Sequence, residues 1–533
     1  MSNKKYPYND IPVTKDLKEM VEFCAKTYGD DTAFWYTKGK NEIRHSFKDV
    51  KADMDAMGTY LHSIGLKNTH ISLIGENSYE WIVCYFAVIC GGNVIVPVDK
   101  EQTPEDVQYV VEKSEATAII HSKLYADKTD LCNVQKISME NFDEYIAKGK
   151  ELIANGERSF VDHQVDREVM AAIVFTSGTT SRPKGAMLTH KGLMTDAITS
   201  LMNLSIPKGT VLMLPLYHTF GFMAGVACQM LVGFPVFINS SLKKLLSDIK
   251  YAAPGHVSVV PMVLKVMYNK IWDNIRKQGK EKLVKTMIKV SNGLLKVGID
   301  MRRVFFKQIL DAFGGNLEMI ISGGSALDEK YVAGFRDLGI TVTSGYGITE
   351  CSPIVSTMRT KHYSPASVGA VHPGVECRIK DGEIQIKGDI VFLGYYKDEA
   401  ATAAAFDGEW FKTGDLGYLD DDGLLYISGR EKNLIILSNG KNVSPEELEA
   451  MLYDTIDEIE EVVVKGEDDQ IVAEVFPIQV EDESASAKTE KEKSIKSKIN
   501  ELNRKLPSFK KIADVRFRDT EFEKTTTKKI KRK

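Results

Sequence analysis

Short apolar runs alternate with helix-like stretches along most of the chain before Pro373. Apolar residues recur at helical spacing from Phe47 to Ile64, and the pattern stops at Gly65. Other apolar runs are short and typical of buried strands, and they occur at residues 71–74, 118–120, 171–175, 211–214, 236–238, 257–260 and 319–322. Strands that alternate with amphipathic helices predict an α/β fold with largely parallel sheets.

The stretch from Trp81 to Val98 is nearly uncharged and long enough to be considered as a membrane span. The residues Gly91-Gly92-Asn93 interrupt it, and Pro97 follows. We therefore predict a buried helix at Glu80–Cys90 and a buried strand at Val94–Val96 in place of a transmembrane helix.

The pattern changes after about Pro373. Alternating residues at 383–387 and 423–427, with Gly and Asp turns nearby, predict short antiparallel strands. Beyond Gly429 the chain starts again, with a strand-like run at Asn433–Leu437, a turn at 439–440 and a helix that begins at Pro445.

Two further stretches near the C-terminus differ in character. The charged run at 481–494 predicts a solvated loop, whereas apolar residues from Ile495 to Leu506 predict an amphipathic helix. The whole pattern predicts a large N-terminal domain at 1–428, with mostly parallel sheets packed with helices and a β-rich subdomain. A short connection at 429–432 and a small α+β C-terminal domain at 433–533 follow.

Composition limits the class of protein. A chain of 533 residues exceeds what one hydrophobic core usually supports, and a formal net charge of −5 gives no overall attraction to nucleic acid or to an anionic membrane. Seven cysteines without a C-x-x-C pair argue against a disulfide framework or structural zinc. The start, Met1 to Lys5, is not followed by an apolar core of signal-peptide type, so we expect a cytoplasmic protein.

The stretch from Thr176 to Gly185 follows a predicted strand and is rich in Gly, Ser and Thr. Backbone N–H groups and hydroxyls in such a loop can donate to phosphate oxygens, while Lys184 supplies a positive charge. A P-loop NTPase instead reads G-x-x-x-x-G-K-[ST] before a helix. Taken alone, a loop of this composition is more often a surface turn.

Four later stretches have similar alternatives. His218 follows a strand among aromatics and, alone, fits a structural histidine; residues 321–327 end a strand in glycines and, alone, fit a turn. Residues 344–350 combine Tyr, Thr and Glu on a glycine-flanked turn, which suits a base, a phosphate and Mg²⁺. Asp415 and Arg430 offer a carboxylate and a guanidinium for a ribose or a phosphate.

In this order and spacing, the chain resembles the adenylate-forming (AMP-binding) superfamily. The stretches that carry the resemblance are the 176–185 loop, 214–221, 321–327, 344–350, Thr413-Gly414-Asp415 and Gly429-Arg430-Glu431-Lys432. The segment from Gly429 to Glu447 looks like that of bacterial long-chain fatty acyl-CoA synthetases.

The resemblance implies a ligase that uses ATP, Mg²⁺ and coenzyme A. A fatty acid would attack the α-phosphate of ATP to give acyl-AMP and pyrophosphate, and a thiol would then displace AMP. The positions that the resemblance assigns to ATP are Thr176, Ser177, Gly178, Thr179, Thr180, Lys184, Gly324, Ser325, Gly345, Tyr346, Gly347, Thr349, Asp415 and Arg430. Glu350 would hold the metal, and Lys529, Thr349 and His218 would take part in catalysis. Residues 429–432 would be the hinge of a mobile small domain, with Lys432 as the residue about which it turns.

The catalytic lysine of the family follows a glycine, but here Lys528 stands before Lys529. A basic tail is the alternative at this position. The thiol of an acyl carrier protein remains an alternative acceptor of the acyl group. Two other functions, a P-loop phosphotransferase and a non-catalytic lipid-binding relative, are disfavoured. Peripheral contact with a membrane is left open.

Overall fold

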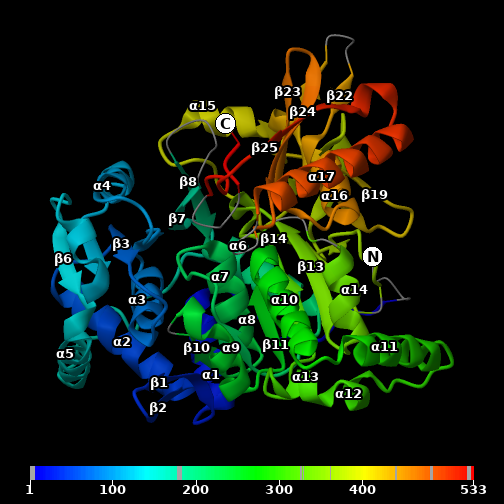
Figure 1. Ribbon diagram of the computed structural model, residues 1–533. Coiled ribbons are helices and arrows are strands. Elements are labelled where there is room, and N and C mark those ends of the chain that lie inside the picture. Colours follow the sequence, from blue (N-terminus) through cyan, green and yellow to red (C-terminus); the bar gives the residue numbers. More distant parts are fainter. Residues whose placement is uncertain are drawn as a thin grey trace.

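The computed structural model describes residues 6–176, 183–239, 241–324, 327, 329–360, 362–437, 441–479, 484–524 and 530–532, and the structural statements below concern these residues. In Figure 1 a large N-terminal domain lies below a smaller C-terminal domain. Helices and mixed sheets occur throughout, which confirms the predicted α/β class. The boundaries at 428 and 433 remain a prediction.

The first sheet of the large domain has six strands in the order β6-β5-β3-β4-β7-β8. They are β3 (His70–Ile74), β4 (Val94–Pro97), β5 (Ala118–His121), β6 (Gln135–Ser138), β7 (Met170–Thr176) and β8 (Lys184–Thr189). Neighbours are parallel except in the hairpin of β7 and β8. Helices along this part of the chain are α1 (Leu17–Tyr28), α2 (Phe47–Ser63), α3 (Tyr79–Ile89), α4 (Pro104–Lys113), α5 (Phe142–Ala154) and α6 (His190–Asn203).

Helix α3 is the element that the sequence could have placed in a membrane. Ser78 caps it by accepting from the Trp81 N–H at 3.1 Å, and every residue of the helix except Glu80 is buried. The predicted buried helix and the strand β4 after it are therefore confirmed. No helix in the described part of the chain is long and apolar enough to cross a membrane.

Two more sheets complete the body of the large domain, in the orders β2-β1-β10-β9 and β11-β12-β13-β14-β15. Their strands are β1 (Thr32–Lys38), β2 (Asn41–Ser46), β9 (Thr210–Leu212), β10 (Val236–Ile238), β11 (His256–Val259), β12 (Met319–Ser322), β13 (Thr341–Gly347), β14 (Ile354–Thr357) and β15 (Ala370–Val371). Their helices are α7 (Thr219–Phe222), α8 (Cys228–Leu231), α9 (Leu245–Ala252), α10 (Pro261–Lys277), α11 (Glu281–Lys296), α12 (Arg302–Phe305), α13 (Lys307–Asp311) and α14 (Glu329–Asp337).

The β-rich part of the large domain is antiparallel, as its alternating sequence predicts. It contains β16 (Glu376–Lys380), β17 (Glu383–Lys387), α15 (Glu399–Ala405), β18 (Phe406–Asp407), β19 (Trp410–Leu419) and β20 (Leu425–Arg430). Strand β19 pairs with both β17 and β20 and thereby sets Asp415 opposite Arg430.

The small domain packs two helices on short sheets, and its core includes Val443, Leu448, Val464 and Ile499. Its elements are β21 (Ile435–Ile436), β22 (Asn442–Val443), α16 (Pro445–Thr455), β23 (Ile459–Glu467), β24 (Gln470–Pro477), α17 (Ala485–Lys505) and β25 (Ile512–Phe517).

The solvated loop predicted at 481–494 is wrong from residue 485 onward, where helix α17 begins. Ser484 caps this helix by accepting from the Ala487 N–H at 3.3 Å, and Ala, Lys and Glu are strong helix formers. Buried Ile495 and Ile499 fix the second half of the helix on the core. A charged composition therefore marked an exposed helix and not a loop.

Candidate active site

The glycine-rich stretch lies at a hairpin. Thr176 ends β7 and Lys184 opens β8, the two residues are antiparallel partners, and the Thr176 hydroxyl donates to the Lys184 carbonyl at 3.4 Å. Ser177, Gly178, Thr179 and Thr180 lie outside the described residues. Because a strand and not a helix follows the stretch, the arrangement differs from a P-loop.

The turn after β12 has room on one side. Gly324 has a φ of +91°, and a Cβ placed there would meet no heavy atom within 4 Å. Its neighbour Gly323 is confined, since a Cβ there would lie 3.0 Å from the ring of Phe220 in α7. His218 immediately precedes α7, with its ring 4.5 Å from that of Tyr217. The structure thus brings the His218 segment to the glycine turn, whereas Ser325 lies outside the described residues.

Tyr346, Asp415 and Arg430 meet in one network. The Tyr346 hydroxyl donates to Asp415 Oδ2 at 2.7 Å, and Arg430 Nε lies 2.8 Å from Asp415 Oδ1. Asp415 is only 3% exposed, and Tyr346 is also buried. Burial, with the carboxylate beside it, raises the pKa of Tyr346 well above its usual range, so this hydroxyl stays a donor. The sequence did not show that these three residues touch.

Glycines shape the turn that carries Tyr346. A Cβ at Gly347 would lie 2.2 Å from the Pro353 carbonyl oxygen, and one at Gly345 would lie 2.8 Å from that of Ser356. Both distances are below contact, so only glycine permits β13 and β14 to approach so closely. Thr349 then opens the 3-10 helix Thr349–Cys351 at the end of the turn.

Glu350 is a buried carboxylate, 6% exposed, and its Oε1 accepts from the Tyr395 hydroxyl at 2.8 Å. Burial is the largest influence and raises the pKa of Glu350, while Tyr395 and the charge of Arg430 oppose that rise. The ammonium of Lys184 lies 5.1 Å from the centre of the Tyr395 ring. Tyr395 therefore lies between the predicted metal ligand and the predicted phosphate lysine.

Sequence reasoning missed Tyr395 and Asp196. Tyr395 reaches the site because residues 394–396 pair with the edge of β8, where the Tyr396 N–H donates to the Gly185 carbonyl at 2.8 Å. Asp196 of α6 is fully buried and accepts from the Ile354 N–H at 2.8 Å, which holds the chain just beyond Glu350. No spacing rule connects either residue to the motif that it supports.

The predicted hinge lies at the edge of this network. Lys432 belongs to the 3-10 helix Glu431–Asn433, directly after β20 and Arg430. Partial burial and the nearby charge of Arg430 lower the pKa of Lys432, and Asp415 opposes them. On the small-domain side, the Ser444 hydroxyl donates to the Ser428 carbonyl at 2.7 Å, so the two domains meet at this point.

Lys528 and Lys529 lie outside the described residues, but the residues on either side are held in place. Lys524 and Ile530 form a β-bridge, and Ile530 packs on the apolar cluster of Val463, Phe476 and Phe522. The Lys531 N–H donates to the Glu523 carbonyl at 2.7 Å. The described residues on either side of Lys528 and Lys529 are thus joined to the small domain.

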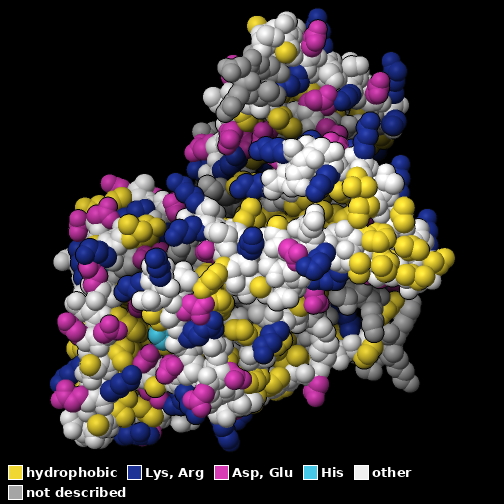
Figure 2. Space-filling model, turned by 60° about the horizontal axis from the view of Figure 1, so that its bottom comes forward, with side chains coloured by type: hydrophobic (Ala, Val, Ile, Leu, Met, Phe, Trp, Pro, Cys, Tyr) yellow, Lys and Arg dark blue, Asp and Glu magenta, His cyan; other side chains and the backbone are white. Residues whose placement is uncertain are grey.

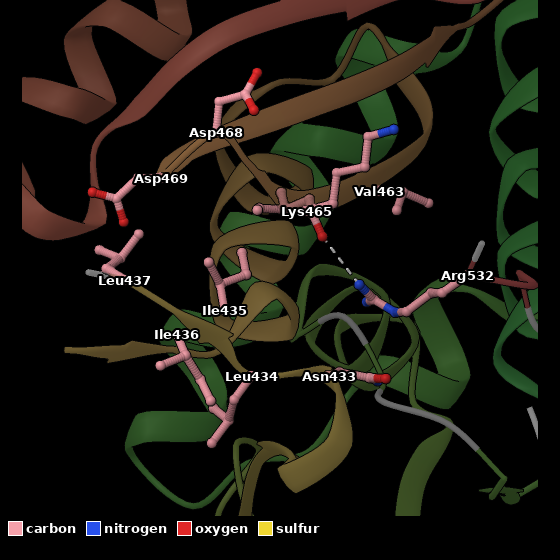
Figure 3. Close-up of a pocket in the computed structure, with 12 residues that line it drawn as sticks. Asn433, Leu434, Ile435, Ile436, Leu437, Val463, Lys465, Asp468, Asp469 and Arg532 are labelled. Atoms are coloured by element: carbon pink, nitrogen blue, oxygen red, sulfur yellow. Dashed lines mark hydrogen bonds between the residues drawn. The ribbon is translucent and has the colours of Figure 1, made fainter. Parts of the chain in front are cut away.

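A pocket of about 390 Å³ lies in the small domain (Figure 3). Residues 433–437 and 463–466, Asp468, Asp469 and Arg532 line it, and none of them is a predicted site residue. Arg532 pairs with Glu449 and donates to the Val464 carbonyl at 3.2 Å, so it joins the end of the chain to the core of this domain.

No group of three or more His, Cys, Asp and Glu residues gathers as a metal cluster among the residues described. A single carboxylate is nevertheless sufficient where phosphate oxygens complete the coordination of Mg²⁺. Glu350 fits that role, because it is a buried carboxylate that the Tyr395 hydroxyl contacts through Oε1.

Known proteins show the same pattern. The family model "AMP-binding enzyme" matches residues 21–396, and the model "AMP-binding enzyme C-terminal domain" matches residues 432–533. A long-chain-fatty-acid–CoA ligase (FadD15) of Mycobacterium bovis is 31% identical over 425 residues, which cover 74% of this chain and 70% of the relative. The chloroplastic long-chain-fatty-acid–[acyl-carrier-protein] ligase AEE15 of Arabidopsis thaliana is 26% identical, over 93% of this chain and 80% of the relative.

Among solved structures, the anthranilate CoA ligase AuaEII in complex with anthranoyl-AMP superposes with a TM-score of 0.77 at 19% identity. The superposition covers 98% of this chain and 96% of that one, which confirms the fold. The two family models together cover most of the chain, so the protein belongs to the AMP-binding enzyme family.

Proposed function

We propose that the protein is an acid–thiol ligase that activates a medium- to long-chain fatty acid. In the first half-reaction, the fatty carboxylate attacks the α-phosphate of ATP and forms acyl-AMP with release of pyrophosphate. In the second half-reaction, the thiol of coenzyme A attacks the acyl carbon, AMP leaves, and a thioester forms. The network of Tyr346, Asp415 and Arg430 beside Glu350 is the observation that carries this proposal.

Each polar group of the network suits one part of the nucleotide. Asp415 can accept from the ribose hydroxyls, and Arg430, which is paired with Asp415, would contact the same sugar. The ring of Tyr346 offers a face for adenine, beside the open turn at Gly324. Because the carboxylate and hydroxyl are already oriented by each other, little ordering is needed when the nucleotide binds.

The phosphates of ATP would lie on the side of Glu350 that faces the β7–β8 hairpin, away from the residues assigned to adenine and ribose. Lys184 and Thr176 flank the hairpin that we assign to the β- and γ-phosphates, and Thr349 faces the α-phosphate in this assignment. When bound, Mg²⁺ would neutralise charge on the phosphate oxygens. Glu350 would hold that ion, and the Tyr395 hydroxyl, which donates to Glu350 Oε1, would restrict the orientation of the carboxylate.

The remaining assignments concern acid and domain movement. His218, beside the glycine turn, would line the carboxylate end of the acyl site. Lys529 would place an ammonium between the two reacting anions, and Lys432 would be the point about which the small domain turns between half-reactions.

A fatty acid as the substrate is supported by the names of the relatives, which are ligases of long-chain fatty acids. Coenzyme A is the acceptor that we propose, and an acyl carrier protein is the second candidate, because the Arabidopsis relative that covers most of this chain uses such a carrier.

The experiment measures pyrophosphate release with saturated acids of increasing length, and then thioester formation with coenzyme A or a phosphopantetheinylated carrier protein. Each CH₂ buried in an apolar site contributes about 0.8 kcal/mol, so kcat/KM should climb by up to about 15-fold per added pair of carbons until the site is filled. A preference for acetate or for an amino acid would contradict the proposed substrate class.

A further inference from the structure

Helix α11 and the segments on either side of it carry a concentration of positive charge that the proposed active site does not use. Residues 276–307 contain ten Lys and Arg residues and only two acidic residues, Glu281 and Asp300. The whole chain has a formal net charge of −5, so the positive charge of this segment is opposite in sign to that of the whole chain. A local excess of this kind attracts polyanionic surfaces.

The same helix exposes a row of apolar side chains. Leu283, Val290 and Val297 are spaced by seven residues and are 57%, 51% and 72% exposed, respectively. Beyond the helix, Ile299 and Val304 are 50% and 64% exposed. Figure 2, with the bottom of the molecule brought forward, shows a hydrophobic patch at the right edge, on the side where Figure 1 places α11. We call these five residues the α11 apolar row.

Other residues of α11, and not the α11 apolar row, pack against the core of the large domain. Helix α11 buries Val284 and Ser291, and Met287 and Ile288 pack partly against the adjacent cluster. Seven residues make nearly two helical turns, so Leu283, Val290 and Val297 share a face that lies beside the buried one. Exposed apolar residues gathered on one face commonly mark a binding surface.

A row of lysines runs parallel to the apolar row. Lys282, Lys289 and Lys296 each precede one apolar residue and are also spaced by seven. In the part of the chain that the structure describes, the ion pairs of α10 to α12 join Arg276 to Asp273, Lys285 to Glu281 and Arg302 to Asp300. None of these pairs uses the three lysines of the row, which remain available to an external anion.

We propose that this face of α11 docks the protein on an anionic lipid membrane. The lysine row would lie among the phosphate groups of the lipids while the α11 apolar row enters the boundary between headgroups and acyl chains, as in interfacial amphipathic helices. Paired rows of charge and apolar area favour this partner over a nucleic acid, which offers charge alone. The inference extends the proposed function, because docking places the enzyme where a fatty acid is dissolved.

The test uses the full chain and vesicles of phosphatidylcholine, with or without phosphatidylglycerol, in a sedimentation assay without ATP. The wild type should bind the anionic vesicles at least about 10-fold more tightly than the neutral ones, and added salt should weaken that binding. The triple variant Lys282→Gln, Lys289→Gln, Lys296→Gln should lose at least about 10-fold in partitioning, since each lysine near the surface contributes severalfold. The variant Leu283→Ser, Val290→Ser, Val297→Ser should lose a similar factor.

A matched control removes the same charge elsewhere. Lys26, Lys38 and Lys40 are exposed on the N-terminal part of the large domain, and their replacement by Gln should leave vesicle binding unchanged. Thermal melting and turnover of a short, soluble fatty acid without vesicles should be unaltered in all three variants. Because the binding assay needs no turnover, its result is separate from the outcome for the proposed function.

Three results would overturn the proposal. Full vesicle binding by both α11 variants would remove this face from the contact. Loss in the lysine variant alone, with competition by a DNA duplex, would mean that the surface binds polyanions in general. A wild-type dimer in sedimentation that the apolar variant converts to monomer would assign the row to a second copy of the chain.

Discussion

Two regions are held by different kinds of contact. One is the network in the large domain that we propose binds the nucleotide, and the other is the pair of segments that flank Lys529 in the small domain. Asp415, Glu350 and Tyr346 are buried, and each has a specific polar partner inside the fold. The described residues that flank Lys529 are held by the bridge of Lys524 with Ile530 and by the half-exposed pair of Lys531 and Glu523. The first region is fixed before any ligand arrives, whereas the second belongs to a separate, lightly attached unit.

Contacts between the domains are few and polar in the part of the chain that the structure describes. Besides the bond from Ser444 to Ser428, Lys265 donates to the Glu460 carbonyl at 3.5 Å and Lys330 pairs with Asp457. Exposed ion pairs of this kind contribute about 0–1 kcal/mol each. In the proposed function, the large domain would bind the nucleotide in one geometry, and the small domain would change position between the two half-reactions.

The largest effect is expected when Lys529, the lysine that we assign to catalysis in the small domain, is removed. An ammonium shared by the carboxylate and the α-phosphate offsets a repulsion that grows toward the transition state, and removal of one such group costs about 2.7–4 kcal/mol. Lys529→Ala should therefore slow acyl-AMP formation by about 10²- to 10³-fold, measured as pyrophosphate release. Thioester formation from supplied acyl-AMP should be spared.

Lys528→Ala is the matched control, and it should be mild in both assays. If Lys528→Ala is the damaged variant instead, the reactive position is shifted by one residue. If both variants are mild, the small domain supplies no such charge and the comparison fails.

The second test changes the buried carboxylate of the large domain. Glu350→Gln keeps the size of the side chain but removes the charge that would hold Mg²⁺, so pyrophosphate release should fall by about 10²-fold. Unchanged turnover in a folded variant would remove Glu350 from the site.

The same variant has a stability signature that depends on pH. Burial raises the pKa of Glu350 above its usual value of 4.5, so the folded protein disfavours the charged form. The resulting penalty is absent below pH 4.5 and appears as pH rises through the raised pKa. Glu350→Gln should therefore melt at the same or a higher temperature than the wild type near pH 8, and the advantage should shrink toward pH 4.5. A lower Tm at high pH would contradict this sign.

The third test concerns movement between the regions. Proline fixes φ, so Lys432→Pro should hinder a change of backbone angle at the proposed hinge. We expect thioester formation from supplied acyl-AMP to fall at least about 10-fold, with a much smaller effect on pyrophosphate release. Lys432→Ala, which retains backbone freedom, is the control and should resemble the wild type. Equal losses in the two half-reactions would place the hinge elsewhere.

Much of the fold could be predicted because buried strands and helices require apolar residues, which are visible as short runs in the sequence. The runs at 71–74, 118–120 and 319–322 became β3, β5 and β12 for that reason. Strand pairing could not be predicted, because partners such as Phe34 and Val236 are parallel neighbours from distant parts of the chain. The charged stretch that forms the start of α17 misled the prediction, since composition alone does not distinguish an exposed helix from a loop.

Some residues of the candidate site could likewise be predicted from the sequence, and others could not. Tyr346, Glu350, Asp415 and Arg430 stand in short motifs, so the sequence indicated their identity, and only the pairing of β19 with β20 showed that Asp415 and Arg430 meet. Tyr395 stands in no motif that the sequence reading used. It faces Glu350 because its segment joins the edge of β8, and a contact made by tertiary pairing leaves no local pattern.

The smallest expected effect, and the finest test of how the large domain fixes its site, comes from Tyr395→Phe. The variant removes the hydroxyl that donates to Glu350 at 2.8 Å and leaves the ring. A hydrogen bond to a charged group is worth about 1.5–3 kcal/mol, and part of that loss should be recovered by water, so pyrophosphate release should fall about 3- to 10-fold. Mg²⁺ concentration for half-maximal rate should rise as well.

The pH profile separates this role from simple packing. The Tyr395 bond lowers the pKa of Glu350, so its removal should raise that pKa further and move the acidic limb of pyrophosphate release to higher pH. Tyr396→Phe is the matched control, because the neighbouring hydroxyl binds the exposed Glu115 at 2.7 Å, and its profile should not move. In the background of Glu350→Gln, Tyr395→Phe should shift nothing, since the titrating group is gone. A shift that persists in that background would assign the acidic limb to another residue and would leave Tyr395 with a packing role only.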